Sequence, residues 1–460
     1  MTAATAAPTA RRILDRDRIL GSDLPSRVFR LALVGSLALF YAVGRRQWFV
    51  RDDWAFLLSR QRLRQREGIG AWLFTGQDGH WMTPPLAFWR LLQNVFGVGS
   101  YWPYLVPTMA LHILAVLLVR MWCRRLGVSA WTTTIVSVLL LVFGTGWEDI
   151  VFAVQLVYNL SLVCFLAHLR LVDHDGPVDR RDVIGAALGL LSITSSGFGP
   201  FFLVGVGALL VLRRRWVAAA VAVVPQGLAY LWWWVAWGGD PTAERHPAGV
   251  RAIVRYAREM LSLTLGGMTG QVILGGAALL GIVAMCVWRQ RLDWRRRSVL
   301  LALAATVVVM FGGIATQRAG LGLASATSGR YQYMGAMLLA PALALAVDQV
   351  RRFDRYALLA VRVVLVVAVA QNARALVRWA DHWADVARAD QQLFEIVAGF
   401  PGIEQADQRL MMSDYNPDVL LADLPLLVAD GAITPRTDLT HDEQQIVVDI
   451  TNGKPVHRVP

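Results

Sequence analysis

The sequence predicts an all-α integral membrane protein with many transmembrane helices. Of its 460 residues, 56% are hydrophobic and only 17% are charged, whereas soluble domains average about 45 to 50% apolar and about 25% charged residues. The apolar residues gather in runs close to the roughly 17 to 25 residues that a helix needs to cross a bilayer. The runs are continuous, as in 31–43 and 299–311, and an alternating pattern would be expected of a transmembrane β-barrel. A soluble protein and a barrel are both excluded.

Eleven apolar segments are candidate spans, of which the fifth and sixth are short. A polar N-terminal segment, 1–27, precedes them, and residues 28–371 form the predicted membrane domain. Since helices satisfy their own backbone hydrogen bonds in hydrocarbon, we expect each segment to be helical. The segments are 28–44, 102–122, 131–147, 150–172, 183–195, 198–212, 216–237, 268–288, 299–316, 331–347 and 356–371.

Arginine clusters in alternate loops predict the orientation of these spans. Clusters such as 213–215 and 295–297 occupy every second loop, and short basic loops remain in the cytoplasm. This places the N-terminus of a multi-pass plasma-membrane protein in the cytoplasm. The long loops 45–101 and 238–267, and the C-terminus after an odd number of spans, then face outside. Because the same clusters account for the net charge of +12, no nucleic-acid partner is expected.

The C-terminal region, 372–460, differs in charge from the rest of the chain. It has 14 acidic and 7 basic residues, against 19 acidic and 38 basic residues in 1–371. Such a reversal of sign marks a separate, water-exposed region. Turn pairs such as Pro401-Gly402 and Asn452-Gly453 divide it into short segments. We expect a small helical appendage outside the membrane.

The first outer loop contains two amphipathic segments. Residues 54–67 and 84–96 mix apolar and basic or polar side chains at near helical spacing, which predicts helices lying in the membrane interface. Between them, His80 belongs to a polar turn. Its imidazole is suited to bind a metal or a sugar hydroxyl, and a solvated loop histidine is the alternative.

Asp52 and Asp53 begin this loop among aromatic residues. Adjacent carboxylates repel each other and are partly desolvated near an apolar interface, which raises one pKa toward the range of a general base. The alternative is structural, because Asp53 precedes the segment 54–63 in the manner of an N-cap. The residues alone leave both interpretations open.

A second acidic pair, Glu148-Asp149, lies in the next outer loop, and Gln155 follows it into the fourth span. Together with the first aspartate pair and His80, these groups offer the oxygen ligands that a hard cation such as Mg²⁺ or Mn²⁺ prefers. The alternative is that Glu148 and Asp149 only terminate a helix. The sequence does not decide whether the groups converge on a metal.

Arg330 stands at the outer start of the tenth span, and Arg318 lies close before it in the sequence. A guanidinium group offers a charge-assisted fork of donors for phosphate. An interfacial anchor formed by Arg330 and Tyr331 is the alternative.

In their order along the chain, these features resemble the C-type (GT-C) glycosyltransferase superfamily. The features are the aspartate pair after the first helix, the amphipathic loop helices, the second acidic loop and Ser328-Gly329-Arg330-Tyr331 entering a late helix. Residues 424–435 also resemble a segment of actinobacterial members. The resemblance implies an active site on the outer face and a polyprenyl-phosphate sugar donor held among membrane lipids. It also implies a glycan, lipid or protein acceptor of the cell envelope.

The resemblance further implies inversion at the anomeric carbon, with Asp52 or Asp53 as the general base and Arg330 on the donor phosphate. A divalent cation is used by some members and not by others. A transporter or flippase is the rival class, but the chain has no repeated half and few ionisable residues at mid-membrane positions. A non-catalytic scaffold is the third class, and it predicts that the outer-loop carboxylates are dispensable.

Overall fold

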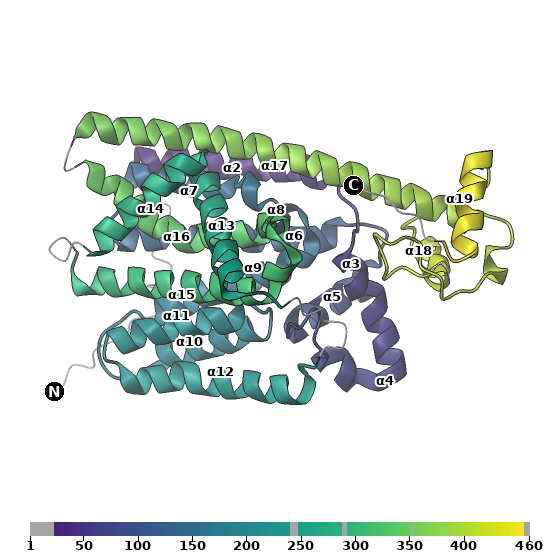
Figure 1. Ribbon diagram of the computed structural model, residues 1–460, viewed down its shortest axis with the longest axis horizontal. Coiled ribbons are helices and arrows are strands. Elements are labelled where there is room, and N and C mark those ends of the chain that lie inside the picture. Colours follow the sequence, from purple (N-terminus) through teal and green to yellow (C-terminus); the bar gives the residue numbers. More distant parts are fainter. Residues whose placement is uncertain (1–22, 240–246, 288–291, 352–353, 455–460) are drawn as a thin grey trace, which may run out of the picture.

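The computed structural model describes residues 23–239, 247–287, 292–351 and 354–454. Long helices form a bundle, and the first outer loop and the C-terminal region gather at one end of it (Figure 1). No β-strand occurs in these ranges. The predicted all-α polytopic membrane fold is confirmed. The bundle consists of α2 (Leu24–Gly44), α6 (Trp102–Arg125), α7 (Ala130–Leu141), α9 (Leu156–Val172), α10 (Arg180–Ile193), α11 (Gly199–Leu212), α12 (Trp216–Trp237), α13 (Val250–Thr269), α14 (Val272–Val287), α15 (Trp294–Arg318), α16 (Gly329–Val350) and α17 (Arg355–Ala398).

Shorter elements connect these helices at the end of the bundle that carries the loops. They are α3 (Asp52–Trp54), the π-helical turn η2 (Ala55–Ser59), α4 (Arg60–Phe74), α5 (Thr83–Phe96), η3 (Gly144–Gly146), α8 (Glu148–Val151), η4 (Ala153–Gln155), η5 (Ala319–Leu321), η6 (Leu323–Thr327), η7 (Ile403–Gln405), η8 (Leu421–Asp423), α18 (Leu424–Ala429) and α19 (His441–Thr451).

Each predicted span overlaps a helix of the bundle, although 131–147 and 150–172 extend beyond α7 and α9. By length and composition, 7 helices of the described chain can cross a membrane alone, or 8 if α13 and α14 count as one span bent by 101°. The helices α7 and α11 are apolar but shorter, and α10 has only 14 residues. The total of eleven spans therefore stays a prediction.

The structure differs from the prediction in the loop 238–267, most of which is the helix α13. This helix carries Arg251, Arg255 and Arg258 on exposed or part-exposed positions, while Tyr256 and Met260 are buried. An amphipathic helix of this kind has no continuous apolar run, so a search for such runs interprets it as a loop. It packs against α14, α15 and α16.

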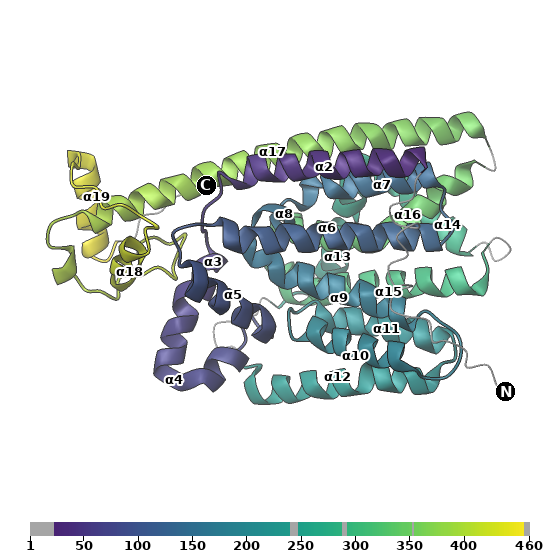
Figure 2. The same cartoon turned by 180° about the vertical axis from the view of Figure 1, so that it is seen from behind.

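The helix α17 runs unbroken from Arg355 to Ala398, across the boundary predicted at residue 372. It lies beside α2 along the bundle and continues past it (Figure 2). Buried residues such as Leu376, Trp383 and Ala387 keep one face of the helix apolar after the change in charge. The globular part of the C-terminal region begins only after Ala398.

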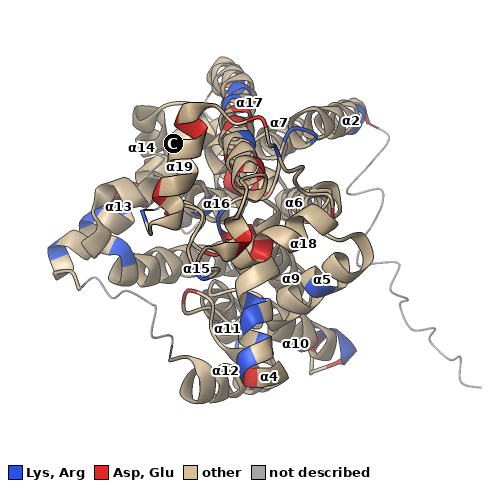
Figure 3. Cartoon of the chain, turned by 90° about the vertical axis from the view of Figure 1, so that its right-hand side faces the viewer, with Lys and Arg blue, Asp and Glu red and all other residues tan. Residues whose placement is uncertain are grey.

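The first outer loop folds into helices, as predicted. The helix α5 coincides with the segment 84–96, while the other segment is divided among α3, η2 and α4. Seen from this end, the arginines of α4 lie near acidic residues of the C-terminal region (Figure 3). The guanidinium group of Arg62 pairs with the Asp423 carboxylate at 2.6 Å. The loop and the C-terminal region are thus in direct contact.

Candidate active site

Asp53 is fully buried behind the turn that follows α2. Its Oδ2 accepts hydrogen bonds from the Val50 amide at 3.1 Å and from the Tyr101 hydroxyl at 3.0 Å. Its Oδ1 accepts from the Val154 amide at 3.1 Å. The helix α3 begins at Asp52 without a side-chain cap, so the N-cap interpretation of Asp53 is wrong. The side chain instead joins the first outer loop to η4.

The environment of Asp53 acts on its pKa in two directions. Burial raises the pKa to about 7, and the charge of Asp52 adds to this effect. The hydrogen bonds from Val50, Tyr101 and Val154 oppose it, because they favour the carboxylate. Tyr101 is itself fixed, since its oxygen accepts from the Ala153 amide at 2.8 Å.

Asp52 is only half-buried and lies on the other side of the same turn. It is close enough to interact electrostatically with Arg330 and Tyr158, which come from two other helices. The preceding residue, Arg51, has a φ of 51°, a left-handed conformation that is uncommon for a residue with a side chain. This sharp turn separates the surroundings of the two aspartates.

Glu148 and Arg330 form an ion pair between α8 and the start of α16. Arg330 Nε lies 3.1 Å from Glu148 Oε2, and the Arg330 side chain is 30% exposed. Glu148 also accepts from the Gly329 amide at 2.7 Å and from the Ser328 hydroxyl at 3.2 Å. The guanidinium carbon of Arg330 is 6.0 Å from the centre of the Tyr158 ring. The terminal nitrogens of the Arg330 guanidinium group are therefore not used by Glu148, and part of the side chain is exposed on the surface.

Asp149 and Gln155 are predicted site residues whose side-chain oxygens take no part in the Glu148–Arg330 ion pair. Both are buried, and neither Asp149 carboxylate oxygen nor Gln155 Oε1 has a hydrogen-bond donor within the described ranges. Burial raises the pKa of Asp149 well above its usual value, the charge of Glu148 adds to this, and that of Arg330 opposes it. Burial thus favours the neutral form of the Asp149 carboxyl group.

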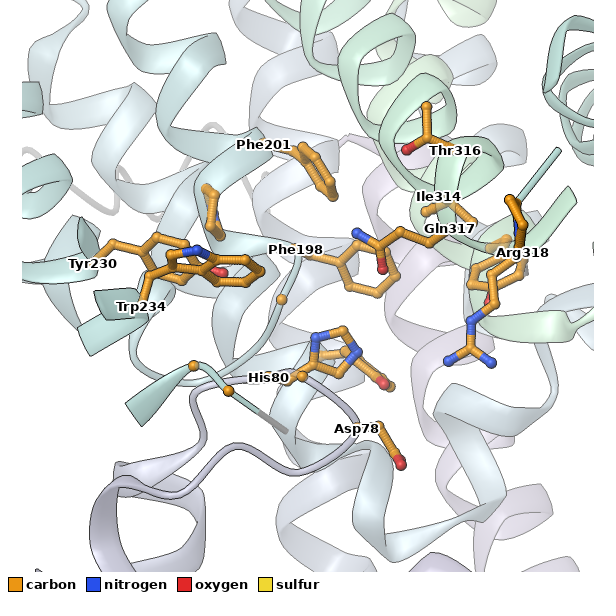
Figure 4. A pocket seen from close by; sticks show the side chains of 18 residues that line it. Asp78, His80, Phe198, Phe201, Tyr230, Trp234, Ile314, Thr316, Gln317 and Arg318 are labelled. Atoms are coloured by element: carbon orange, nitrogen blue, oxygen red, sulfur yellow. The ribbon is translucent and has the colours of Figure 1, made fainter. Parts of the chain in front are cut away.

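A cavity of about 930 Å³ opens next to the ion pair. In Figure 4, Tyr230 and Trp234 of α12 lie across it from Arg318 at the end of α15, and His80 enters from the first outer loop. Tyr158 also contributes to the wall, so the cavity adjoins Arg330. The lining consists of Asp78, Gly79, His80, Tyr158, Gly197, Phe198, Pro200, Phe201, Tyr230, Trp234, Gly238, Gly239, Pro247, Ile314, Thr316, Gln317, Arg318 and Tyr331.

His80 depends on a glycine for its place in the cavity wall. A Cβ atom added at Gly197 would lie only 1.9 Å from His80 Nδ1, so the ring packs directly on the backbone of the turn between α10 and α11. On its other side the His80 ring meets Tyr158, with 6.4 Å between the ring centres. His80 thus lies in the cavity wall, where it packs against Gly197 and Tyr158.

A cation site formed by the outer carboxylates is not supported by this geometry. Glu148 is engaged by Arg330, and Asp53 by three donors. Within the described ranges, three ligands converge only at His174, Asp179 and Asp182, at the opposite end of α9. There Arg215 Nη2 already lies 3.0 Å from Asp182 Oδ2. Dependence on Mg²⁺ or Mn²⁺ stays a prediction, and no chemical step below requires it.

The structure adds residues that the sequence did not single out. Tyr101 and the amide of Val154 hold Asp53, and Asn416 of the C-terminal region accepts a hydrogen bond from the Arg51 amide at 2.8 Å. The Ser196-Gly197 turn was visible in the sequence only as a break between two spans. In the sequence, Gly197 was the one available signal that another side chain packs closely against this turn.

Comparison with known proteins gives structural matches only. No family model and no curated protein matches the sequence. Two crystal structures of ArnT from Cupriavidus metallidurans do match, one bound to undecaprenyl phosphate and one in the apo state, with TM-scores of 0.52 and 0.53. In each case the identity is 14%, and the match covers 94% of this chain and 90% of ArnT. The chain therefore has a polytopic helical fold similar to that of ArnT.

Proposed function

We propose that this protein is a membrane glycosyltransferase that moves a sugar from a polyprenyl-phosphate donor to an acceptor of the cell envelope. The observation that carries the proposal is the position of the cavity. Its aromatic wall leads to the guanidinium groups of Arg318 and Arg330, and Asp52 is close enough to Arg330 to interact with it electrostatically. The fold of ArnT, which was crystallised with undecaprenyl phosphate, supports the same conclusion.

The cavity fits the two chemical parts of such a donor. An isoprenoid chain is apolar and packs against aromatic side chains such as Phe198, Phe201 and Trp234. The phosphate binds the planar donor forks of Arg318 and Arg330, which match phosphate oxygens. His80 and Asp78 offer hydrogen-bonding groups for the sugar on the side of the first outer loop.

In this proposal Asp52 is the general base, and Asp53 holds the turn that carries Asp52. A base must reach the hydroxyl proton that it removes, and the fully buried Asp53 is engaged by three donors. Asp52 takes the proton of an acceptor hydroxyl, and the hydroxyl oxygen forms a bond to the anomeric carbon. The bond from that carbon to the phosphate oxygen breaks with inversion. The polyprenyl phosphate leaves with its new charge beside Arg330.

The outer face of the plasma membrane is the proposed place of transfer. The site is built from the start of α9, the end of α15 and the start of α16. The arginine-rich segment 295–297 lies at the start of α15, opposite to Arg318, and Arg213 and Arg215 contact Asp173 and Val172 at the other end of α9. If the basic segments are cytoplasmic, the site and the C-terminal region are extracytoplasmic and the N-terminus is inside.

Replacing Asp52 by Asn tests the proposal. We expect sugar transfer from a polyprenyl-phosphate sugar in proteoliposomes to fall by roughly 10²- to 10⁴-fold, the contribution of a positioned base. The matched control is Asp385→Asn on the exposed face of α17, which keeps full activity. Full activity of the Asp52→Asn variant would show that Asp52 is not the general base. A wild type that transfers no sugar but moves a lipid or solute across the vesicle membrane would establish the transporter class instead.

A further inference from the structure

The turn that carries Asp52 is held from two sides. On the inner side, Asp53 is fixed by Val50, Tyr101 and Val154. On the outer side, the Arg51 amide donates to Asn416 Oδ1 at 2.8 Å. Because a φ of 51° is a strained conformation for a residue with a side chain, such a turn persists only where its surroundings enforce it.

Asn416 is suited to fix a single geometry. It is fully buried, and its Nδ2 donates to Asp390 Oδ2 on α17 at 2.9 Å. A backbone amide can only donate and a carboxylate can only accept, so the Asn416 side chain has one orientation that satisfies both partners. The backbone amide of Asn416 donates to the Ser413 hydroxyl oxygen at 3.1 Å. Asn416 thus connects α17 to the peptide that precedes Asp52.

The C-terminal region is anchored to the first outer loop at other points as well. Arg62 pairs with Asp423 at 2.6 Å and donates to the Asp418 carbonyl at 2.6 Å. The Val98 amide donates to Asp430 Oδ2 at 3.2 Å. We therefore expect the C-terminal region to stay bound to the first outer loop when the Asn416 side chain is removed. The effect of this removal on the Arg51 peptide can then be measured separately.

We propose that Asn416 is a positioning residue for sugar transfer, through which the C-terminal region holds the peptide before Asp52 and aims the Asp52 carboxylate. The inference rests on the proposed function, because it assumes that Asp52 is the base. It assigns the C-terminal region a part in forming the active site. Residues 399–454 are thus more than an appendage.

Asn416→Ala tests the link. We expect kcat for sugar transfer to fall roughly 10- to 100-fold, the scale of a misplaced catalytic group, with unchanged donor affinity. Hydrogen exchange in the peptide 49–54 rises, since the Arg51 amide loses its acceptor. The control Asp423→Asn breaks the ion pair with Arg62 in the same interface and keeps kcat and the exchange of that peptide. Wild-type kcat, or unchanged exchange, in Asn416→Ala overturns the proposal.

A charge exchange provides a second test if Asn416→Ala does not fold. Asn416→Asp alone faces the Asp390 carboxylate and lowers kcat through repulsion. Adding Asp390→Asn restores kcat, because the carboxylate at position 416 accepts from both the Arg51 amide and the new side-chain amide. A folded double variant that stays as slow as Asn416→Asp overturns the link alone. A wild type without any sugar transfer defeats the proposed function, whereas the exchange measurement still reports on the hydrogen bond.

Discussion

The two acidic pairs of the outer loops are alike in sequence but opposite in environment. Asp53 and Asp149 are both fully buried, yet Asp53 has three hydrogen-bond donors and Asp149 has none within the described ranges. Their neighbours also differ, since Asp52 is half-buried and Glu148 is bound by Arg330. Burial alone therefore does not make a carboxylate functional. The donors around it decide whether it keeps a charge.

Among the variants that compare the two acidic pairs here, Arg330→Ala gives the largest expected effect, and it tests whether Glu148 serves to orient Arg330. If Glu148 serves to orient Arg330 for a phosphate, donor affinity falls roughly 10- to 100-fold, since hydrogen bonds to charged groups contribute about 1.5 to 3 kcal/mol. Donor binding is measured with a fluorescent polyprenyl-phosphate analogue in detergent. Arg330→Lys keeps the charge without the fork and is expected to be intermediate. Unchanged affinity in a folded Arg330→Ala variant would make the residue an interfacial anchor.

Asp53→Asn sharpens the comparison through pH. The pKa of about 7 means that the carboxylate, with its three accepted hydrogen bonds, predominates above pH 7 and is lost as the pH falls through 7. Wild-type kcat is therefore expected to fall below pH 7. The variant resembles the protonated state, so its kcat at pH 8 is about tenfold lower and changes little between pH 6 and 8. A variant with the wild-type profile would show that Asp53 does not position Asp52.

The sequence predicted the helices well because their signal is local. Continuous apolar runs located the predicted spans, and the acidic pairs and Arg330 were visible as charges beside them. Local patterns failed where helices are amphipathic or outlast a change in charge, as in α13 and α17. They also could not reveal the bond between Arg51 and Asn416, which are 365 positions apart in the chain. Contacts of that kind depend on the tertiary fold.

Asp149→Asn has the smallest expected effect and is the sharpest contrast to Asp53. Because burial raises the pKa of Asp149 well above its usual value, the neutral carboxyl is favoured, and an amide of nearly the same shape should keep transfer within about threefold of wild type. A raised folded-state pKa stabilises the fold at low pH, and this stability is lost as the pH rises above the unfolded value of about 3.9.

The Asp149→Asn variant has no carboxyl group to ionise and does not lose stability in this way as the pH rises. Its thermal midpoint in detergent should therefore rise relative to that of the wild type between pH 5 and pH 8. Asp53→Asn serves as the comparison for sugar transfer, because it removes an acceptor from the buried donors Val50, Tyr101 and Val154. A loss of transfer in Asp149→Asn as large as that of Asp53→Asn, or a midpoint difference from wild type that does not change with pH, would mean that Asp149 is charged in the folded protein. The two acidic pairs would then be functionally equivalent, and the donors around each buried carboxylate would not explain the difference between them.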